Sequence, residues 1–308
     1  MELISIHELK KEEVEEIFSK TSMLKDMSSS EVKGKKFPES GTLSGKTLAL
    51  IFEKPSMRTR ISFEVAMFQL GGHSICLGQN EIQLGVRESI GDVGKVLSRY
   101  VDGIVLRTFA HSNVIELAES ATVPVINGLS DRLHPCQVLS DIYTIREKKG
   151  NGRVKVTFIG DGNNNVTHSW LYGAAKAGLD LSIATPHRYE PLQEIVEEAI
   201  KDAKESGAKI EIMNDAADAV KGADIVYTDV WTSMGKEKER EQRRKVFQDY
   251  RLTQELLEKT GKDTLVMHCL WRDIKKPANL FLFFTFPEQC FNYFSFLFVD
   301  HKIPPELL

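Results

Sequence analysis

Cysteine is scarce in this sequence, with four residues in 308 and no Cys-x-x-Cys pair. This scarcity argues against a zinc site and against a disulfide framework, and it favours a reducing, cytoplasmic environment. An excess of positive charge is also lacking, because 40 Lys and Arg stand against 44 Asp and Glu. The net charge of −4 gives no support for nucleic-acid binding.

Two further signals are missing. The amino-terminal run MELISIHELKKEEVEEIF is a charged helix pattern without the apolar core of a signal peptide. The first half contains no Gly-x4-Gly-Lys-Ser/Thr loop, so nucleoside triphosphate chemistry is not indicated. A length of 308 residues predicts two domains, each able to bury its own core, at ~100–200 residues per domain.

Short apolar runs rich in β-branched residues alternate with amphipathic stretches. The expected strands are 47–53, 102–107, 122–126, 155–160, 181–185, 209–213, 223–228 and 264–269. The expected helices are 59–70, 88–100, 111–121, 135–148, 166–177, 189–206, 215–221 and 252–259. This alternation predicts an α/β fold of two doubly wound parallel-sheet domains, divided near the Gly-Asn-Gly stretch at 150–152.

Ligands of such folds gather where strands end, and the first strand is followed by Ser56-Met57-Arg58-Thr59-Arg60. Hydroxyls and backbone N–H groups at a helix start form an anion cradle, to which the two arginines add charged donors. The alternative is a capped helix with two solvated arginines.

The next two strand ends in this half also carry polar side chains. Arg107 ends an apolar strand, and His134-Pro135-Cys136-Gln137 opens a helix, with His134 and Gln137 three residues apart on one side. Separately, Arg107 is compatible with a surface position and His134 with helix capping. Together these neutral and cationic groups suit a small, highly anionic ligand such as a phosphate ester or anhydride.

The second half opens with Gly160-Asp161-Gly162 after a strand. A dinucleotide-binding interpretation is weak, because Asn165 stands at the third glycine position and no acid follows the next strand. The asparagines at 163–165 either bind a polar ligand or cap the helix.

Two later strand ends complete the candidate site. Asp229 follows an apolar strand and precedes a glycine-containing loop and a charged run at 236–245, a pattern typical of a mobile lid with one fixed carboxylate. Most of that run is interpreted as a solvated helix surface. Cys269 ends the last strand, where it is a ligand contact, inert packing or, least favoured, a nucleophile.

Five motifs in this order resemble the aspartate/ornithine carbamoyltransferase family, and most closely its ornithine enzymes. They are Ser56-Met57-Arg58-Thr59-Arg60, Arg107, His134-Pro135-Cys136-Gln137, Asp229-x-x-x-Ser233-Met234-Gly235 and His268-Cys269-Leu270. The resemblance covers residues 1–270. It implies a carbamoyl-phosphate-binding domain at 1–149 and an ornithine-binding domain at 150–270, with the active site in the cleft between them.

The resemblance also implies the roles of individual residues. Carbamoyl phosphate would contact Ser56, Met57, Arg58, Thr59, Gln83, Arg107, His134, Gln137, Cys269 and Leu270. Ornithine would contact Asn165, Asp229, Ser233 and Met234. Arg107, His134 and Cys269 would be the catalytic residues, and Gln83 would reach a neighbouring subunit's site.

The activity implied is transfer of the carbamoyl group of carbamoyl phosphate to the δ-amine of L-ornithine, giving citrulline. Aspartate would require a site rich in arginine for two carboxylates, whereas this loop offers Asp229 and Ser233. The resemblance implies no metal or organic cofactor and a homotrimer or a multiple of it. A carbamoyltransferase for putrescine or an acylated ornithine, and a catalytically impaired homologue, are the alternatives.

The last 38 residues, 271–308, do not match the family pattern. Eight of the 16 phenylalanines lie between Phe281 and Phe298, and the Pro and Arg expected after Leu270 are missing. A diverged tail, a membrane tail and a shifted reading frame are the three interpretations. Pro287 and several polar positions weaken the membrane interpretation.

Overall fold

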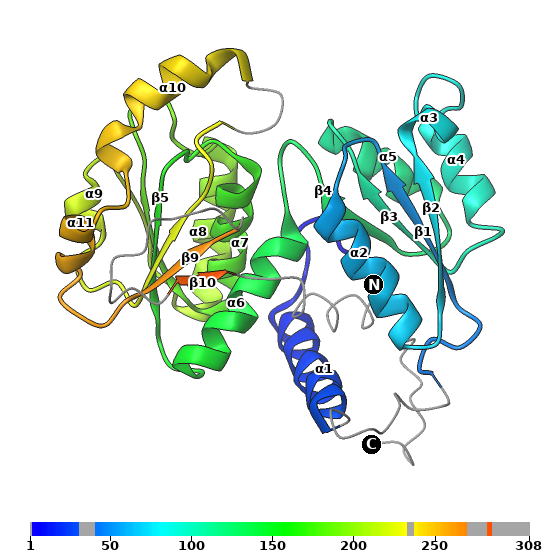
Figure 1. Cartoon of the computed structure of the whole chain (residues 1–308), viewed down its shortest axis with the longest axis horizontal. Helices are drawn as coiled ribbons and strands as arrows, with labels where there is room; N and C mark the ends of the chain where they lie inside the picture. The colour runs from blue at the N-terminus through cyan, green and yellow to red at the C-terminus, as the bar shows by residue number, and fades with distance from the viewer. Residues whose placement is uncertain (1, 31–40, 233–236, 270–281, 285–308) are drawn as a thin grey trace. The chain divides into compact units, whose positions relative to one another are not determined.

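The computed structural model describes residues 2–30, 41–232, 237–269 and 282–284. The described residues form two compact units, the first ending at Cys136 and the second beginning at Gln137. Each unit is built around one sheet in which all strands run parallel (Figure 1).

The first unit contains a four-stranded sheet in the order β2-β1-β3-β4. Its strands are β1 (Thr47–Phe52), β2 (His73–Gly78), β3 (Gly103–Arg107) and β4 (Val125–Leu129). Its helices are α1 (Lys11–Ser30), α2 (Met57–Gln69), α3 (Gln79–Ile82), α4 (Ile90–Leu97) and α5 (His111–Ser120).

Alternate residues of the central strands face opposite sides of this sheet, as the pleat requires. Ala49 and Ile51 of β1 pack with Val93 of α4 and Leu117 of α5 in one apolar cluster. The helix α2, on the crossover between β1 and β2, buries Phe63 and Met67. Because both faces are covered, the central strand β1 is apolar and buried from Leu48 to Phe52.

The second unit contains a six-stranded sheet in the order β10-β9-β8-β5-β6-β7. Its strands are β5 (Lys155–Ile159), β6 (Asp180–Ala184), β7 (Ile210–Met213), β8 (Ile225–Thr228), β9 (Leu265–His268) and β10 (Leu282–Phe284). Its helices are α6 (Pro135–Lys149), α7 (Asn165–Ala177), α8 (Gln193–Ser206), α9 (Ala216–Ala219), α10 (Arg240–Val246) and α11 (Gln254–Glu258). Short 3-10 helices cover Glu237–Glu239 and Gln248–Tyr250.

The central strand β8 separates two packing layers of this unit. Val226 packs with Phe247 and Leu257 on the side covered by α9 and α11. The next residue, Tyr227, faces the other way and meets the ring of Trp170 from α7 edge-on at 5.2 Å. Helices therefore cover both faces, which confirms the expected doubly wound α/β class.

Two strands differ from the sequence-based expectations. The edge strand β2 was not predicted, because His73-Ser74-Ile75-Cys76 alternates polar and apolar residues next to two glycines. The strand expected at 122–126 begins three residues later, after Pro124. The Phe-rich segment 281–298 lies outside the described residues except for β10, which pairs in parallel with β9. No described helix is both long and apolar enough to span a membrane.

Candidate active site

Neighbouring strand ends bring the polar groups of the first unit together. Phe52 at the end of β1 is in register with Arg107 at the end of β3, and Arg107 is in register with Leu129 of β4. The segments that follow these strands begin at the same edge of the sheet, because the three strands are parallel. The start of α2, Arg107 and the loop leading to His134 therefore lie close together.

The start of α2 has open hydrogen-bonding capacity. Ser56 takes the N-cap position with extended backbone dihedrals, and its hydroxyl makes no capping hydrogen bond to the helix. No acidic residue occupies the first turn, so the N–H groups and the positive end of the helix dipole are available to an anion. Arg60 instead forms an ion pair along the helix, from its Nε to Glu64 Oε1 at 2.8 Å.

Arg107 is a buried cation at the centre of this group. Its side chain is 8% exposed, and its Nη1 donates to Thr59 Oγ1 at 3.2 Å. Among the described residues it has no carboxylate partner, and its Nε is buried without a hydrogen bond. Burial, followed by the charge of Arg58, lowers the pKa of Arg107 to about 10, so the side chain stays protonated at neutral pH. A buried, uncompensated guanidinium is stabilised by a bound anion.

His134 lies near the positive charges of Arg107 and Arg58. Burial, then Arg107, then Arg58 lower the pKa of its imidazole to about 3. The ring is therefore neutral at physiological pH and can donate an N–H to a carbonyl oxygen without carrying a charge. Arg58 lowers the pKa of both Arg107 and His134, and Arg107 lowers that of His134. The three side chains therefore lie within electrostatic reach of one another.

Two other predicted site residues, Gln137 and Gln83, are placed by their own elements. Gln137 belongs to the second unit, where its Nε2 donates to Asp141 Oδ1 at 3.0 Å. Gln83 is exposed and ends α3 in a left-handed conformation, with φ of 49°. The role of Gln83 at a neighbouring subunit's site stays a prediction.

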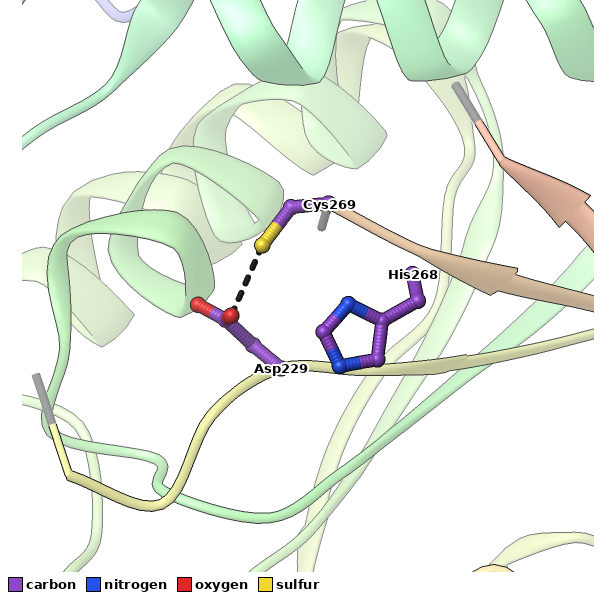
Figure 2. Close-up of side chains that lie close together, drawn as sticks. All are labelled: Asp229, His268 and Cys269. Carbon is purple, nitrogen blue, oxygen red and sulfur yellow. Dashed lines mark hydrogen bonds between the residues drawn. The ribbon is translucent and has the colours of Figure 1, made fainter. Parts of the chain in front are cut away.

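The second unit brings Asp229 and Cys269 into contact. Thr228 of β8 is in register with His268 of β9, so the residues that follow these two strands are neighbours. The thiol of Cys269 donates to Asp229 Oδ1 at 2.7 Å (Figure 2). The backbone N–H of Val230 donates to the same oxygen at 2.6 Å. The two side chains are therefore in direct contact, whereas their roles toward a substrate stay predictions.

Asp229, His268 and Cys269 also resemble a metal-ligand set. Their ligand atoms all lie within 4.8 Å of one another, and carboxylate, imidazole and thiolate are the donors that zinc accepts. The hydrogen bond from Cys269 to Asp229 holds a proton between two of these groups. Zinc would have to displace this proton, because only a thiolate binds the metal.

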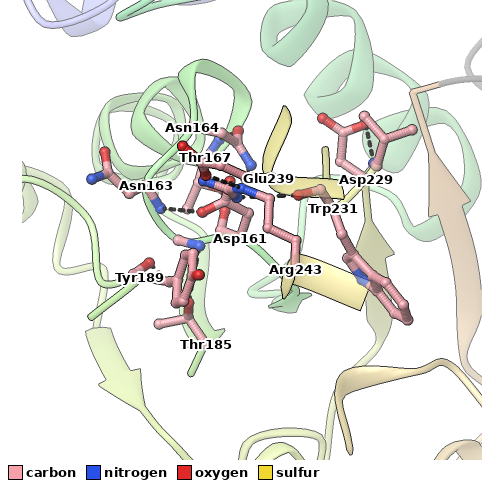
Figure 3. Close-up of polar contacts among 12 residues, drawn as sticks. Asp161, Asn163, Asn164, Thr167, Thr185, Tyr189, Asp229, Trp231, Glu239 and Arg243 are labelled. Carbon is pink, nitrogen blue, oxygen red and sulfur yellow. Dashed lines mark hydrogen bonds and ion pairs between the residues drawn. The ribbon is translucent and has the colours of Figure 1, made fainter. Parts of the chain in front are cut away.

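A buried ion pair ties the loop after β8 to the loop after β5. Arg243 of α10 donates to Asp161 Oδ2 at 2.6 Å, to the carbonyl of Trp231 at 3.1 Å and to Glu239 at 2.8 Å (Figure 3). Arg243 is 3% exposed, and its guanidinium lies 5.0 Å from the ring centre of Tyr189. Arg243 is therefore an exception within the segment 236–245, most of which is interpreted as a solvated surface, and its neighbours Arg240 and Arg244 are exposed.

Asp161 in turn organises the start of α7. Its Oδ1 accepts from the N–H of Asn163, and its carbonyl accepts from Asn164 Nδ2 and Thr167 Oγ1. Asn164 caps the helix through its own Oδ1, which leaves Asn165 as the first helical residue. Of the two alternatives for the asparagines, capping thus holds for Asn164.

The two glycines of this loop have a structural explanation. Gly160 has a φ of +140°, which disfavours other residues, and a Cβ at Gly162 would lie 2.6 Å from the carbonyl oxygen of Tyr189. They serve a tight turn and a close backbone approach. Sequence reasoning missed Asp161 and Arg243, although the spacing of Arg243 from the apolar Phe247 at i+4 was a signal for a shared buried face.

Three predicted site residues, Ser233, Met234 and Leu270, lie outside the described residues. Their roles stay predictions. The described part of the loop ends at Thr232 on one side and resumes at Glu237 on the other.

Family profiles match nearly the whole described chain. Residues 1–147 match the aspartate/ornithine carbamoyltransferase carbamoyl-P binding domain, and residues 152–275 match the Asp/Orn binding domain. The chain belongs to the aspartate/ornithine carbamoyltransferase family. This confirms the resemblance seen in the sequence motifs. The second match ends before the Phe-rich segment begins.

Individual relatives of this family agree. An ornithine carbamoyltransferase of Pyrococcus horikoshii is 52% identical over 229 residues, which are 74% of this chain and 72% of that protein. One of Syntrophus aciditrophicus is 46% identical over 270 residues, or 87% and 86% of the two chains. The solved structure of the Pyrococcus furiosus ornithine carbamoyltransferase has a TM-score of 0.87 and 43% identity, covering 97% of this chain and 95% of that one.

Proposed function

We propose that this chain is an ornithine carbamoyltransferase, which transfers the carbamoyl group of carbamoyl phosphate to the δ-amine of L-ornithine to give L-citrulline and phosphate. The relatives that carry this name at 46–53% identity support it. The structural observation that carries it is Arg107, a buried cation without a carboxylate partner among the described residues, beside the open start of α2.

In the first unit, the phosphate group binds at the start of α2. The backbone N–H groups near Met57, the hydroxyls of Ser56 and Thr59, and the Arg58 guanidinium donate to its oxygens. Arg107 and His134 donate to the carbonyl oxygen. Charge on that oxygen grows as the carbon becomes tetrahedral, so these preorganised donors stabilise the transition state more than the bound substrate.

In the second unit, Asp229 and Cys269 orient the amino acid, together with Asn165, Ser233 and Met234. The neutral δ-nitrogen attacks the carbonyl carbon, the bond from carbon to the phosphate oxygen breaks, and phosphate leaves with the electron pair. The amine gives up one proton, which the phosphate product accepts. Gln137 contacts the carbamoyl amide, and Leu270 lines the same reaction centre.

Each of the two domains binds one of the two substrates. We assign residues 1–149 to carbamoyl-phosphate binding and 150–270 to ornithine binding. The names of the two matched domains support this assignment. The reaction needs no metal or organic cofactor in this scheme, because hydrogen bonds and charges supply the stabilisation.

We also propose that the protein works as a homotrimer in the cytoplasm. Ile61, Phe68, Ile75 and Val86 of the first unit are large apolar side chains with exposed fractions of 46%, 81%, 41% and 85%, an unusual set for a surface that faces only water. Gln83 lies three residues before Val86, so a neighbouring subunit docked here would receive it. Light scattering should give three times the 34.8 kDa chain mass or a multiple of that value.

The substrate assignment is tested by a panel of amines. The purified protein is assayed with carbamoyl phosphate and ornithine, aspartate, putrescine or N-acetylornithine, with product identified by mass spectrometry. Ornithine should be the preferred acceptor by at least tenfold in kcat/KM, because Asp229 pairs with an amine and repels the second carboxylate of aspartate (about 1.4 kcal/mol for tenfold). Preference for another amine would reassign the substrate.

A further inference from the structure

An acidic residue lies directly beside the buried Arg107 and does not form an ion pair with it. The backbone N–H of Glu53, the first residue after β1, donates to the carbonyl oxygen of Arg107 at 2.9 Å. Neighbouring strands are spaced about 4.8 Å apart, a distance that these two long side chains can bridge. A buried guanidinium and a nearby carboxylate attract each other, so their separation calls for an explanation.

The carboxylate of Glu53 is instead held by Thr108, the residue that follows Arg107. The Thr108 hydroxyl donates to Glu53 Oε2. The same hydroxyl oxygen accepts from Asn113 Nδ2 of α5 at 3.1 Å. A threonine hydroxyl has one proton, and the hydrogen bond from Asn113 leaves that proton for Glu53. Because Thr108 is fully buried, its hydrogen bond to an ionised carboxylate is a strong one.

The sheet fixes the position of Thr108. Its backbone N–H donates to the carbonyl oxygen of Leu129, the last residue of β4, at 3.0 Å. Arg107, the preceding residue, donates from Nη1 to Thr59 Oγ1 on α2. Two consecutive residues at the end of β3 therefore hold the acid and the guanidinium to different partners. All of these residues belong to the first unit.

An internal ion pair would compete with a substrate for Arg107. A carboxylate on the guanidinium occupies donors that an anion or a carbonyl oxygen would otherwise use. Substrate binding would then require the pair to open, and the apparent affinity would fall with the fraction of molecules in which the guanidinium is free. A hydrogen bond that keeps Glu53 elsewhere prevents this loss before the substrate arrives.

We propose that Thr108 is a positioning residue that holds the Glu53 carboxylate away from Arg107 and so keeps the guanidinium available to carbamoyl phosphate. The inference rests on the proposed function, since it assumes that Arg107 contacts that substrate. Thr108 itself does not touch the substrate. Its effect passes through Glu53 and Arg107.

The test measures binding of phosphonoacetamide, a hydrolysis-resistant analogue that carries a carbonyl oxygen and an anionic group. Calorimetry on the full chain gives its dissociation constant. Thr108→Val keeps the shape of the side chain and removes the hydroxyl. The dissociation constant should rise about tenfold or more, because the released Glu53 carboxylate pairs with Arg107. Thr108→Ser retains the hydroxyl and should stay within about threefold of wild type.

Removal of the charge at Glu53 separates this proposal from a merely structural role of Thr108. Glu53→Gln has no negative charge to offer Arg107. The double variant Thr108→Val/Glu53→Gln should therefore bind phosphonoacetamide within about threefold of wild type, although the hydrogen bond between the two positions is absent. A structural role predicts instead that the double variant binds as poorly as Thr108→Val, or more poorly.

Thr21 supplies a matched control in the first unit. It is also a fully buried threonine, and its hydroxyl donates to the carbonyl oxygen of Ile17 on α1 at 2.8 Å. Thr21→Val removes a buried hydroxyl in the same way, but this hydroxyl holds no carboxylate. The variant should keep the dissociation constant of phosphonoacetamide within about twofold of wild type.

Two results would overturn the proposal: unchanged affinity in Thr108→Val, or a double variant that binds no better than Thr108→Val. If Thr108→Val does not fold, Asn113→Ala takes its place, because it removes the donor that directs the Thr108 hydroxyl toward Glu53. It should weaken binding about threefold, and adding Glu53→Gln should restore the affinity. The absence of either effect would contradict the proposal. Failure of the wild-type protein to bind phosphonoacetamide or to form citrulline would instead overturn the proposed function.

Discussion

At the residue scale, Arg58 and Arg60 provide a direct comparison. They lie two positions apart on α2, but Arg60 is paired with Glu64 whereas Arg58 lies in the field shared with Arg107 and His134. Arg58→Ala should lower kcat/KM for carbamoyl phosphate by about a hundredfold or more, because a charged donor to the phosphate is lost. Arg60→Ala should remain within a few-fold of wild type in the same steady-state assay. Equal losses in both variants would remove Arg58 from the phosphate role.

His134 should make the stability of the folded protein depend on pH. Its pKa is about 3 in the folded protein and near 6.5 in the unfolded chain, so only the unfolded chain binds the proton between these values. Stability from this residue is complete above pH 6.5 and falls with decreasing pH, by at most about 1.4 kcal/mol per pH unit. Urea unfolding from pH 8 to 5 should therefore show a steeper loss for wild type than for His134→Asn. Parallel curves for the two proteins would contradict the lowered pKa.

At the element scale, Arg243 joins three segments that are separate in the sequence. It links α10 to Asp161 in the loop after β5 and to the carbonyl of Trp231 in the loop after β8. Arg243→Met should raise KM for ornithine at least tenfold and leave KM for carbamoyl phosphate nearly unchanged, because both linked loops belong to the second unit. It should also lower stability by about 3–5 kcal/mol, the cost of leaving the Asp161 charge buried and unpaired.

The exposed neighbour Arg244 supplies the control for this substitution. Arg244→Met removes the same charge from the same helix and should leave both Michaelis constants within twofold of wild type. Asp161→Asn combined with Arg243→Met should partly restore stability, since no uncompensated charge remains. A rise in both Michaelis constants by the same factor would indicate general unfolding instead of loop positioning.

Helices and strands were predicted well from the sequence where one physical signal dominates. Buried parallel strands such as β3 and β8 are continuous apolar runs, and α6 begins at a proline, so their positions followed from composition alone. The edge strand β2 escaped because its exposed face breaks the apolar run. Arg243 escaped because charge predicts exposure, and only the folded chain shows the acid that meets it.

Predicting the site had a similar limit. Strand ends identified Arg107, Asp229 and Cys269, since parallel strands bring their carboxyl ends to one edge. Nothing in the sequence analysis distinguished Arg58 from Arg60 or showed that Gln137 donates to Asp141. Each distinction depends on which side chain meets the residue in the fold, either four residues away on the same helix or on another element. The same sequence pattern is compatible with several such partners.

At the scale of the whole molecule, the match to the family's second domain ends at residue 275, before the Phe-rich segment 281–298. If a shifted reading frame produced the tail from residue 271, an alternative frame of the coding DNA beyond codon 270 should encode a Pro-x-x-Arg-Gly-like run and an amphipathic helix. Replacing 271–308 by the corresponding end of the Pyrococcus furiosus enzyme should then raise kcat by at least tenfold, because the missing Arg would complete the donors to the carbonyl oxygen. An unchanged kcat would favour a diverged but competent tail.

The central claim is that a bond forms between the carbamoyl carbon and the δ-nitrogen of ornithine. The most direct measurement mixes the purified protein with carbon-13-labelled carbamoyl phosphate and ornithine labelled with nitrogen-15 at the δ-position, and follows the carbon NMR spectrum. The account predicts a ureido carbon signal split by one-bond coupling to nitrogen-15, with one phosphate released per citrulline. Phosphate release without a coupled carbon signal, or no reaction at all, would contradict it.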